Sequence, residues 1–154
     1  MPPLSARRVR QNRYNQLKMK IENLRNIEDA YKLWRYCNLR VGEVDSIFEK
    51  GYLEYYKMFP ERYLGVYQNE SLIACCVYFH DFRKASIYRL AVLPKFRNKN
   101  IATLLIIECE RIAKANGINS IYCLIEENNQ NSLKLFKNNS YEVVDSIKYL
   151  IKRL

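Results

Sequence analysis

The chain has 154 residues, a length typical of one domain with its own hydrophobic core. Hydrophobic residues make up 49% of it, which excludes a disordered chain. No apolar run approaches the ~20 residues needed to cross a bilayer. The basic N-terminus is followed by no apolar segment, which argues against a secretory signal. We therefore expect a soluble, cytoplasmic protein without a membrane partner.

The net charge of +10 is unevenly distributed along the chain. Residues 1–16 hold four arginines and no acid, so +10 minus 4 leaves +6 for the remainder. A basic surface suits an anionic ligand or partner. Nucleic acid is possible but not favoured, because no interleaved aromatic and basic motif of the RNA-binding kind is present. We interpret 1–16 as a flexible arm and 17–154 as one domain.

The five cysteines all lie in apolar stretches predicted to be helix or strand. No Cys-x-x-Cys pair occurs, and His80 is the single histidine. We expect reduced, packed thiols and no metal site, with the neighbours Cys75 and Cys76 on opposite faces of a sheet.

The first half of the chain predicts a strand, two helices and a strand meander. Residues 17–24 alternate as a strand does, and Asn26 can cap a helix from about 27 to 39. A second helix, about 44–58, is rich in aromatic residues, namely Phe48, Tyr52, Tyr55 and Tyr56. Three strands then follow at 62–67, 72–79 and 85–93, with His80 in the last turn. Their short connections predict antiparallel pairing.

The second half alternates helices and strands. A helix over 102–116 is closed by Gly117, and a strand is predicted at 120–125. The connection from the strand at 85–93 has the length of a β-α-β unit, so these two strands should be parallel. A short helix at 130–138 and one or two strands within 141–154 complete an α+β fold. Its sheet should be mixed but mostly antiparallel, with helices on both faces.

The most informative stretch is the loop between the strand at 85–93 and the following helix, which reads VLPKFRNKNIA. Lys95, Arg97 and Lys99 place positive charge where the free N–H groups of a helix N-terminus should lie. Such a turn can hold a phosphate or a pyrophosphate.

This order of elements with this loop resembles the GNAT superfamily of acetyl-CoA-dependent N-acetyltransferases. The family's pyrophosphate loop follows Val-x-Pro and reads Arg/Gln-x-x-Gly-x-Gly/Ala. Val92, Pro94, Arg97 and Ala102 match it, and Asn100 replaces the first glycine. Asparagine is the non-glycine residue that best tolerates a left-handed backbone, so the turn can survive. A second family segment is matched by Asn129, Ser132, Leu135, Phe136 and Tyr141, with Ser140 in place of a glycine.

The resemblance implies that the parallel strands separate at one end and that acetyl-CoA lies in the gap. The pantetheine would bind along the strand edge and the pyrophosphate on the loop. The backbone N–H of Val92 would polarise the thioester carbonyl, and an amine would attack directly. The implied CoA-binding residues are Leu90, Ala91, Val92, Arg97, Asn98, Lys99, Asn100, Ile101, Ala102, Thr103, Asn129 and Phe136.

Proton-transfer groups are harder to identify. Phe136 occupies a position where the family often has a proton-donating tyrosine, and the matching base positions hold Ser86, Tyr88 and Leu124. Tyr88 is the candidate proton handler, directly or through water, although a packed strand tyrosine is the favoured interpretation. Glu126 and Glu127 are the alternatives.

The acceptor is expected to be a primary amine, and we favour a protein or peptide N-terminus. A lysine side chain, polyamine, aminoglycoside or aminoacyl-tRNA remains open, as does the choice between monomer and homodimer. Two hypotheses from other classes are a catalytically degenerate CoA-binding regulatory module and a basic protein associated with nucleic acid.

Overall fold

The structure, a computed structural model, describes residues 19–39, 45–152 and 154. The arm expected at 1–16 lies outside these residues. The chain divides into two compact units, Met1–Cys123 and Leu124–Leu154. The single domain expected over 17–154 stays a prediction.

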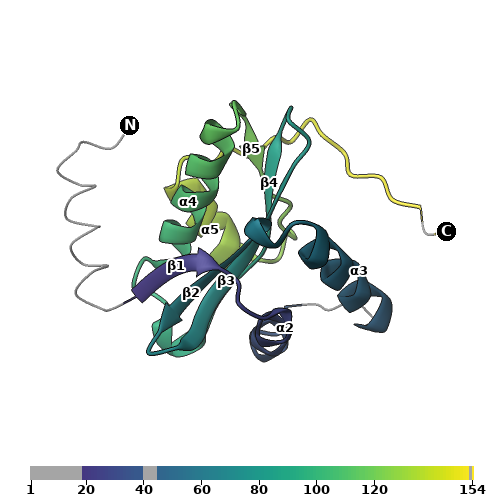
Figure 1. Cartoon of the computed structure of the whole chain (residues 1–154). Helices are drawn as coiled ribbons and strands as arrows, with labels where there is room; N and C mark the ends of the chain where they lie inside the picture. Colours follow the sequence, from purple (N-terminus) through teal and green to yellow (C-terminus); the bar gives the residue numbers. More distant parts are fainter. Residues whose placement is uncertain (1–18, 40–44, 153) are drawn as a thin grey trace. The chain divides into compact units, whose positions relative to one another are not determined.

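The first unit is a five-stranded sheet with three helices. In chain order it contains β1 (Met19–Asn23), α2 (Ile27–Tyr36), α3 (Asp45–Met58), β2 (Tyr63–Gln68), β3 (Ser71–His80), β4 (Ala85–Val92), α4 (Ile101–Ala115) and β5 (Ile121–Tyr122) (Figure 1). The strands lie in the order β1-β2-β3-β4-β5, and all neighbours are antiparallel except β4 and β5. The predicted fold class and the parallel pair are therefore confirmed.

The predicted helix ends follow from local chemistry. The Asn26 side chain accepts a hydrogen bond of 2.9 Å from the Glu28 N–H, as expected of an N-cap. Gly117, at φ 73°, ends α4 in the left-handed conformation that glycine adopts without strain. The Ile118 N–H then bonds back to the Ala113 carbonyl at 2.9 Å.

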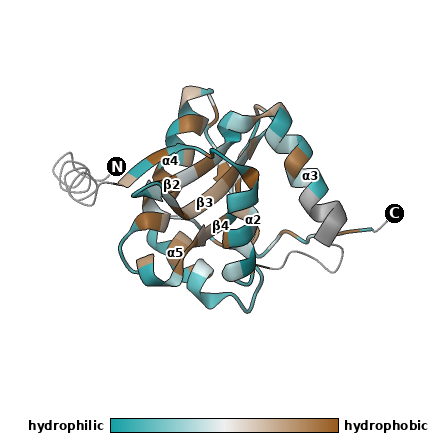
Figure 2. Ribbon diagram, turned by 60° about the horizontal axis from the view of Figure 1, so that its bottom comes forward, coloured by the Kyte–Doolittle hydropathy of each residue, from teal (hydrophilic) through white to brown (hydrophobic). Residues whose placement is uncertain are grey.

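Apolar side chains pack on both faces of the sheet, where Figure 2 shows hydrophobic strands between α4 and α2. Cys75 belongs to the core cluster that contains Trp34 of α2. Its neighbour Cys76 lies on the other face, with its Sγ 3.7 Å from the Sγ of Cys109 in α4. The prediction that Cys75 and Cys76 face opposite ways is confirmed. Burial raises the pKa of the Cys75 thiol, so it stays protonated.

Strand β4 contains a bulge in the middle of its pairing with β3. Cys75 is opposite Ala91 and Val77 is opposite Tyr88, so Cys76 alone faces two residues of β4, Arg89 and Leu90. Arg89 adopts φ 54°, a left-handed conformation that costs an L-residue about 1–2 kcal/mol. A bulge of this kind redirects side chains and increases the local twist.

Strand β5 is shorter than the predicted 120–125 and pairs with β4 only opposite Ala85 and Ser86. The two parallel strands are therefore joined at one end. Within the described part of the chain, no other strand pairs with β4 on that side beyond Ser86.

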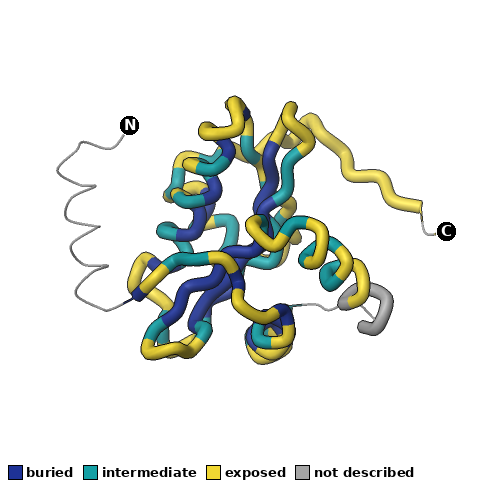
Figure 3. The backbone as a smooth tube through the Cα atoms, viewed as in Figure 1, coloured by how far each residue is buried: buried dark blue, intermediate teal, exposed yellow. Residues whose placement is uncertain are grey.

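In the second unit, α5 (Gln130–Asn138) matches its predicted bounds. The Asn129 side chain caps it by accepting from the Ser132 N–H at 3.1 Å, and Ser140 adopts φ 69° at the position where the family has glycine. The strands predicted within 141–154 are wrong for the described residues, which contain none there. A strand must pair its N–H and C=O groups with a neighbour, and this unit offers no second strand. The apolar residues at its end are exposed (Figure 3), among them Val144, Ile147, Tyr149 and Leu150.

Two glycines give a direct test of the packing around the sheet. A Cβ on Gly65 would lie 2.8 Å from the Tyr67 ring and 2.9 Å from a Leu72 methyl group. We expect Gly65→Ala to lower the free energy of unfolding by about 1–3 kcal/mol, measured by urea denaturation.

The matched control is Gly51→Ala in α3, where a Cβ would meet no atom within 4 Å. Alanine should there raise the free energy of unfolding by about 0.5–1 kcal/mol through helix propensity. Equal effects of the two changes would contradict the packing described for β2.

Candidate functional site

The carboxyl end of β4 presents a free backbone edge. The Leu93 N–H donates to the Ile73 carbonyl of β3 at 2.9 Å. Because successive N–H groups of a strand point to opposite sides, the Val92 N–H points away from β3. That is the side on which β5 pairs only with Ala85 and Ser86. The predicted thioester-polarising N–H therefore lies at an edge of the sheet that no described strand covers.

The predicted loop begins directly on this edge. The Arg97 Nε donates to the Val92 carbonyl at 2.9 Å, and the Cys37 thiol donates to the same oxygen at 3.6 Å. The Arg97 side chain is thus tied to the end of β4. Sequence reasoning placed Arg97 in the loop but did not foresee that its side chain anchors the loop to the strand.

The loop backbone has the conformation that its asparagines predict. Pro94–Phe96 forms a single 3-10 turn, and Asn98 and Asn100 have φ values of 59° and 62°. Asn100 therefore replaces a family glycine in the left-handed conformation, as expected. Its side chain makes no capping hydrogen bond to α4. The Leu104 N–H is bonded to the Asn100 carbonyl at 3.1 Å, so Asn100 stands at the start of α4.

Positive charge collects on the same turn. The Lys95 and Lys99 ammonium groups lie 5.1 and 5.6 Å from the centre of the Phe96 ring. Residues 97–100 are exposed to solvent. A helix N-terminus with flanking cations and a left-handed turn is the arrangement that binds phosphate groups in many proteins.

Aromatic side chains of α3, β3 and β4 pack against one another as a wall on one face of the sheet. The Phe79 ring stacks on Tyr55 at 4.1 Å and meets Tyr88 edge-on at 5.1 Å. Burial, followed by interaction with Tyr122, raises the pKa of Tyr88 to about 12. Roughly one Tyr88 phenol in 10⁵ is then ionised at pH 7, so this side chain cannot serve as a base at neutral pH. Ser86, whose side chain is hydrogen-bonded to Tyr88, is buried.

Arg89 is the residue of this wall that sequence reasoning missed. Its guanidinium carbon lies 5.7 Å from the Trp34 ring centre and 5.4 Å from that of Tyr52. Its Nε donates to the Tyr52 hydroxyl at 3.3 Å, and its backbone carbonyl accepts from the Trp34 indole N–H at 3.0 Å. The available signal was a charged residue inside the apolar strand SIYRLAV.

The remaining predicted residues belong to the second unit. Asn129 caps α5, and the Phe136 ring packs edge-on against Tyr141 at 5.0 Å. Leu124, Glu126 and Glu127 are exposed. The roles of these residues towards CoA or the acceptor stay predictions.

His80 is the last residue of β3, not part of the turn, and it is half-buried. Its ring Nε2 lies 3.1 Å from an Arg62 nitrogen, and burial together with Arg62 lowers its pKa. It pairs with Ala85, seven residues before Val92, which places it roughly 20 Å from the free edge. It is too distant to exchange a proton there.

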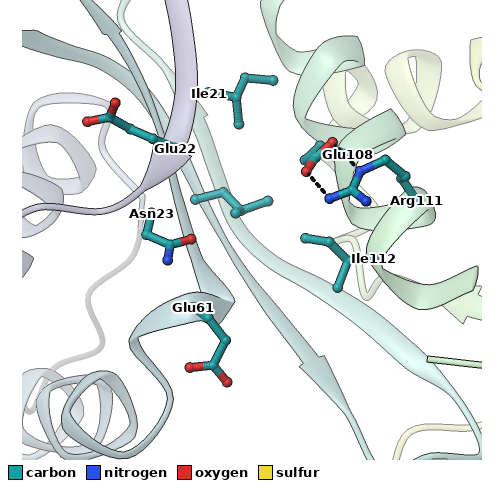
Figure 4. A pocket seen from close by; sticks show the side chains of 8 residues that line it. Ile21, Glu22, Asn23, Glu61, Glu108, Arg111 and Ile112 are labelled. Atoms are coloured by element: carbon teal, nitrogen blue, oxygen red, sulfur yellow. Dashed lines mark hydrogen bonds and ion pairs between the residues drawn. The ribbon is translucent and has the colours of Figure 1, made fainter. Parts of the chain in front are cut away.

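A separate hollow of about 350 Å³ lies between β1, β2 and the later turns of α4 (Figure 4). Its carboxylates are already paired, Glu22 with Arg25, Glu61 with Arg62 at 3.8 Å and Glu108 with Arg111 at 2.8 Å. Glu108 lies seven residues into α4, about 10 Å along the helix from the loop. This hollow is therefore not part of the loop site.

Among the residues that the structure describes, no cluster of three or more His, Cys, Asp or Glu side chains is placed to hold a metal ion. No helix among these residues is both long and apolar enough to span a membrane.

The curated relatives are acetyltransferases. One from Pectobacterium atrosepticum is 30% identical over 88 residues, which are 57% of this chain and 62% of that protein. One from Yersinia pestis is 26% identical over 129 residues, or 84% and 89% of the two chains. The match to the Pectobacterium protein thus spans less than two thirds of its length.

Solved structures share the fold. A predicted acetyltransferase with acetyl-CoA from Clostridium acetobutylicum has a TM-score of 0.65 at 14% identity, covering 86% of this chain and 96% of that one. PaiA N-acetyltransferase from Thermoplasma acidophilum, in complex with coenzyme A, has a TM-score of 0.62 at 21% identity, covering 83% and 92%. The model of the acetyltransferase (GNAT) family matches residues 22–141. The chain therefore belongs to the GNAT acetyltransferase family.

Proposed function

We propose that this protein transfers an acetyl group from acetyl-CoA to a primary amine of low pKa, with a peptide N-terminus the favoured acceptor. The observation that carries the proposal is the uncovered Val92 N–H next to a left-handed, cationic turn at the start of α4. Family membership supports it, as do two structural neighbours, one solved with acetyl-CoA and one in complex with coenzyme A.

Each part of the site has a task in this proposal. The β4 edge at Leu90, Ala91 and Val92 binds the pantetheine as a peptide would add a strand. The N–H groups of 98–103, with Lys99 and Arg97, hold the pyrophosphate. The family pattern also implies roles for Asn129 and Phe136 in binding CoA, and these stay predictions.

The transfer needs one electrophile and one deprotonated amine. Acetyl-CoA supplies the thioester, whose carbonyl carbon forms a bond to the amine nitrogen. The C–S bond breaks and its electron pair stays on sulfur. The proton lost by the amine goes to solvent or to the thiolate. The Val92 N–H is placed to stabilise the negative charge on the carbonyl oxygen. The Tyr88 phenol, the candidate nearest this edge, is protonated and so accepts no proton from the amine.

The positions that match the family's base hold Ser86, Tyr88 and Leu124, and their lack of Glu or His favours an acceptor amine that is partly neutral by itself. At pH 7, an α-amine with a pKa of about 7.8 is roughly 14% neutral, but a lysine with a pKa of about 10.4 is only about 0.04% neutral. That ratio corresponds to about 3.5 kcal/mol of help in deprotonation. A site without a strong base therefore suits a peptide N-terminus better than a lysine side chain.

The conformation of Asn100 provides a test of the cofactor loop. Acetyl-CoA should bind with a Kd below about 1 mM in low salt. Asn100→Gly should preserve the affinity within about threefold, because glycine adopts φ 62° freely. Asn100→Val should weaken it at least about tenfold, because a β-branched residue resists the left-handed turn. Titration calorimetry measures all three.

Equal affinity of the glycine and valine variants would show that the turn does not hold the pyrophosphate. Circular dichroism of both variants checks that α4 remains folded. Absence of any acetyl-CoA binding by the unaltered chain at millimolar concentration would overturn the proposed function itself.

The choice of acceptor can be tested with two matched peptides, one carrying a free N-terminus and one a blocked N-terminus with an internal lysine. Near pH 7 the free N-terminus should be acetylated faster. Its rate should rise with pH through the amine's own pKa, because Tyr88 stays protonated over this range and Arg89 cannot accept a proton. Equal or faster acetylation of lysine at pH 7 would indicate an enzyme base, with Glu126 and Glu127 the first to replace by glutamine.

The role of Tyr88 can be tested separately by Tyr88→Phe. A phenol with a pKa of about 12 is a poor proton donor to a thiolate and is not a base, so kcat should fall by less than about tenfold. The KM for acetyl-CoA should not change. A fall of about 10²-fold or more in kcat would instead identify Tyr88 as part of a proton relay.

A further inference from the structure

The backbone of β4 changes the side on which it bonds between its two ends. In a regular strand, residues an even number of positions apart direct their N–H groups to the same side. Ala85 and Leu93 are such a pair. The Ala85 N–H nevertheless donates to the Ser120 carbonyl, directly before β5, at 2.9 Å. The Leu93 N–H donates to the Ile73 carbonyl of β3, also at 2.9 Å. One extra residue is therefore inserted between the two ends.

The bulge at Arg89 is this insertion, and it decides the direction of the Val92 N–H. If the pairing of Tyr88 with Val77 continued without the bulge, the Val92 N–H would be directed at β3. With the bulge, the Leu93 N–H takes that role and the Val92 N–H points away from β3. The N–H that the proposed transfer uses is thus available because the strand contains the extra residue.

The bulge requires a backbone conformation that arginine adopts only at a cost. Arg89 has φ 54°, in the left-handed region where the Cβ of an L-residue crowds the following carbonyl oxygen. Residues in such conformations persist where their surroundings hold them in place, and they cluster at functional sites. We therefore looked for the group that holds the Arg89 peptide.

The Trp34 side chain of α2 is placed to hold this peptide. Its indole N–H donates to the Arg89 carbonyl at 3.0 Å, and Trp34 is buried. The indole ring packs against the Tyr31 and Tyr52 rings, at centroid distances of 5.8 and 5.3 Å. Relaxation of the bulge would take the carbonyl away from a buried donor that cannot easily follow it. Such a loss is costly, so the hydrogen bond opposes relaxation.

We infer that Trp34 is a positioning residue for the acetyl transfer. Its indole N–H holds the left-handed Arg89 peptide, and the resulting bulge directs the Val92 N–H to the side of β4 where the thioester would lie. The inference rests on the proposed function for its catalytic step. The direction of the N–H groups, by contrast, can be measured without any substrate.

The first test removes the donor and keeps the ring. The chain contains one tryptophan, so a tryptophan-requiring expression host can replace it throughout by benzothienylalanine, in which sulfur takes the place of the indole N–H. Trp34→Phe is the second variant. Amide hydrogen exchange, followed by NMR, is then measured at Val92 and Leu93.

In the unaltered chain the Leu93 N–H, bonded to β3, should exchange at least about tenfold more slowly than the Val92 N–H. In both Trp34 variants the ratio of the two rates should change by at least about tenfold, with Leu93 faster and Val92 slower. The two rates change in opposite directions because a relaxed strand bonds Val92 to β3 in place of Leu93.

Tyr63→Phe is the matched control. It removes another buried donor to a backbone carbonyl, since the Tyr63 hydroxyl donates to the Tyr52 carbonyl at 2.7 Å, and it leaves β4 unaltered. A loss of stability alone should accelerate exchange at Val92 and Leu93 together and leave their ratio unchanged.

Arg89→Gly tests whether backbone strain is what Trp34 opposes. Glycine adopts φ 54° freely, so the bulge should need less support in this background. Trp34→Phe should there change the ratio of the Val92 and Leu93 rates by less than about threefold. An equal change in both backgrounds would contradict a role for Trp34 against strain.

The kinetic readout uses acetyl-CoA and a peptide with a free N-terminus. Both Trp34 variants should lower kcat at least about tenfold, because the donor to the thioester carbonyl is misdirected. The KM of the peptide should stay within about threefold of its original value, as expected when an interaction made only in the transition state is lost.

An unchanged ratio of the Val92 and Leu93 rates in both Trp34 variants would overturn the inference, and so would a changed ratio with an unchanged kcat. A changed ratio in a chain that transfers no acetyl group would support the role of Trp34 in the bulge and contradict the proposed function. Acetyl transfer without any change of the ratio would do the reverse.

Discussion

Strand β4 pairs with β3 along its length but with β5 only at Ala85 and Ser86, and the features of the site depend on this unequal pairing. It leaves the Val92 N–H at an uncovered edge. It also allows the chain to leave β4 through a 3-10 turn and enter α4 from the same end. The Arg97 side chain joins the two by donating to the Val92 carbonyl at 2.9 Å. This hydrogen bond fixes the loop before α4 to the end of β4.

A second constraint acts three residues earlier in the same strand. The left-handed Arg89 peptide makes the bulge, and the Trp34 indole N–H bonds to its carbonyl. This places helix α2 in contact with the strand that carries the proposed acetyl-donor site. The bulge directs the Arg89 side chain to the Trp34 and Tyr52 rings, while the edge of β4 beyond Ser86 is paired with no other described strand.

Much of this arrangement could be predicted from the sequence because it depends on local patterns. Four local features follow from preferences of single residues or of their neighbours. They are the N-cap at Asn26, the end of α4 at Gly117, the opposite faces of Cys75 and Cys76, and the left-handed conformation of Asn100. The bulge could not be predicted, because it depends on the register between β3 and β4 rather than on either strand. The prediction of C-terminal strands was wrong for a related reason, because the apolar residues there give no information about whether a partner strand is available. Arg89 was not identified because the sequence alone does not show which face of the strand a charged residue occupies.

The proposed site requires acetyl-CoA to bind along the edge of β4 beyond Ser86 and on the loop before α4. NMR amide hydrogen exchange, measured with and without CoA, is the decisive test because it reports each N–H separately. We expect slower exchange at Leu90, Val92 and residues 98–103 when CoA is present, with β1 unchanged. Unchanged exchange at these positions, or protection confined to the hollow lined by Glu22 and Arg111, would contradict it.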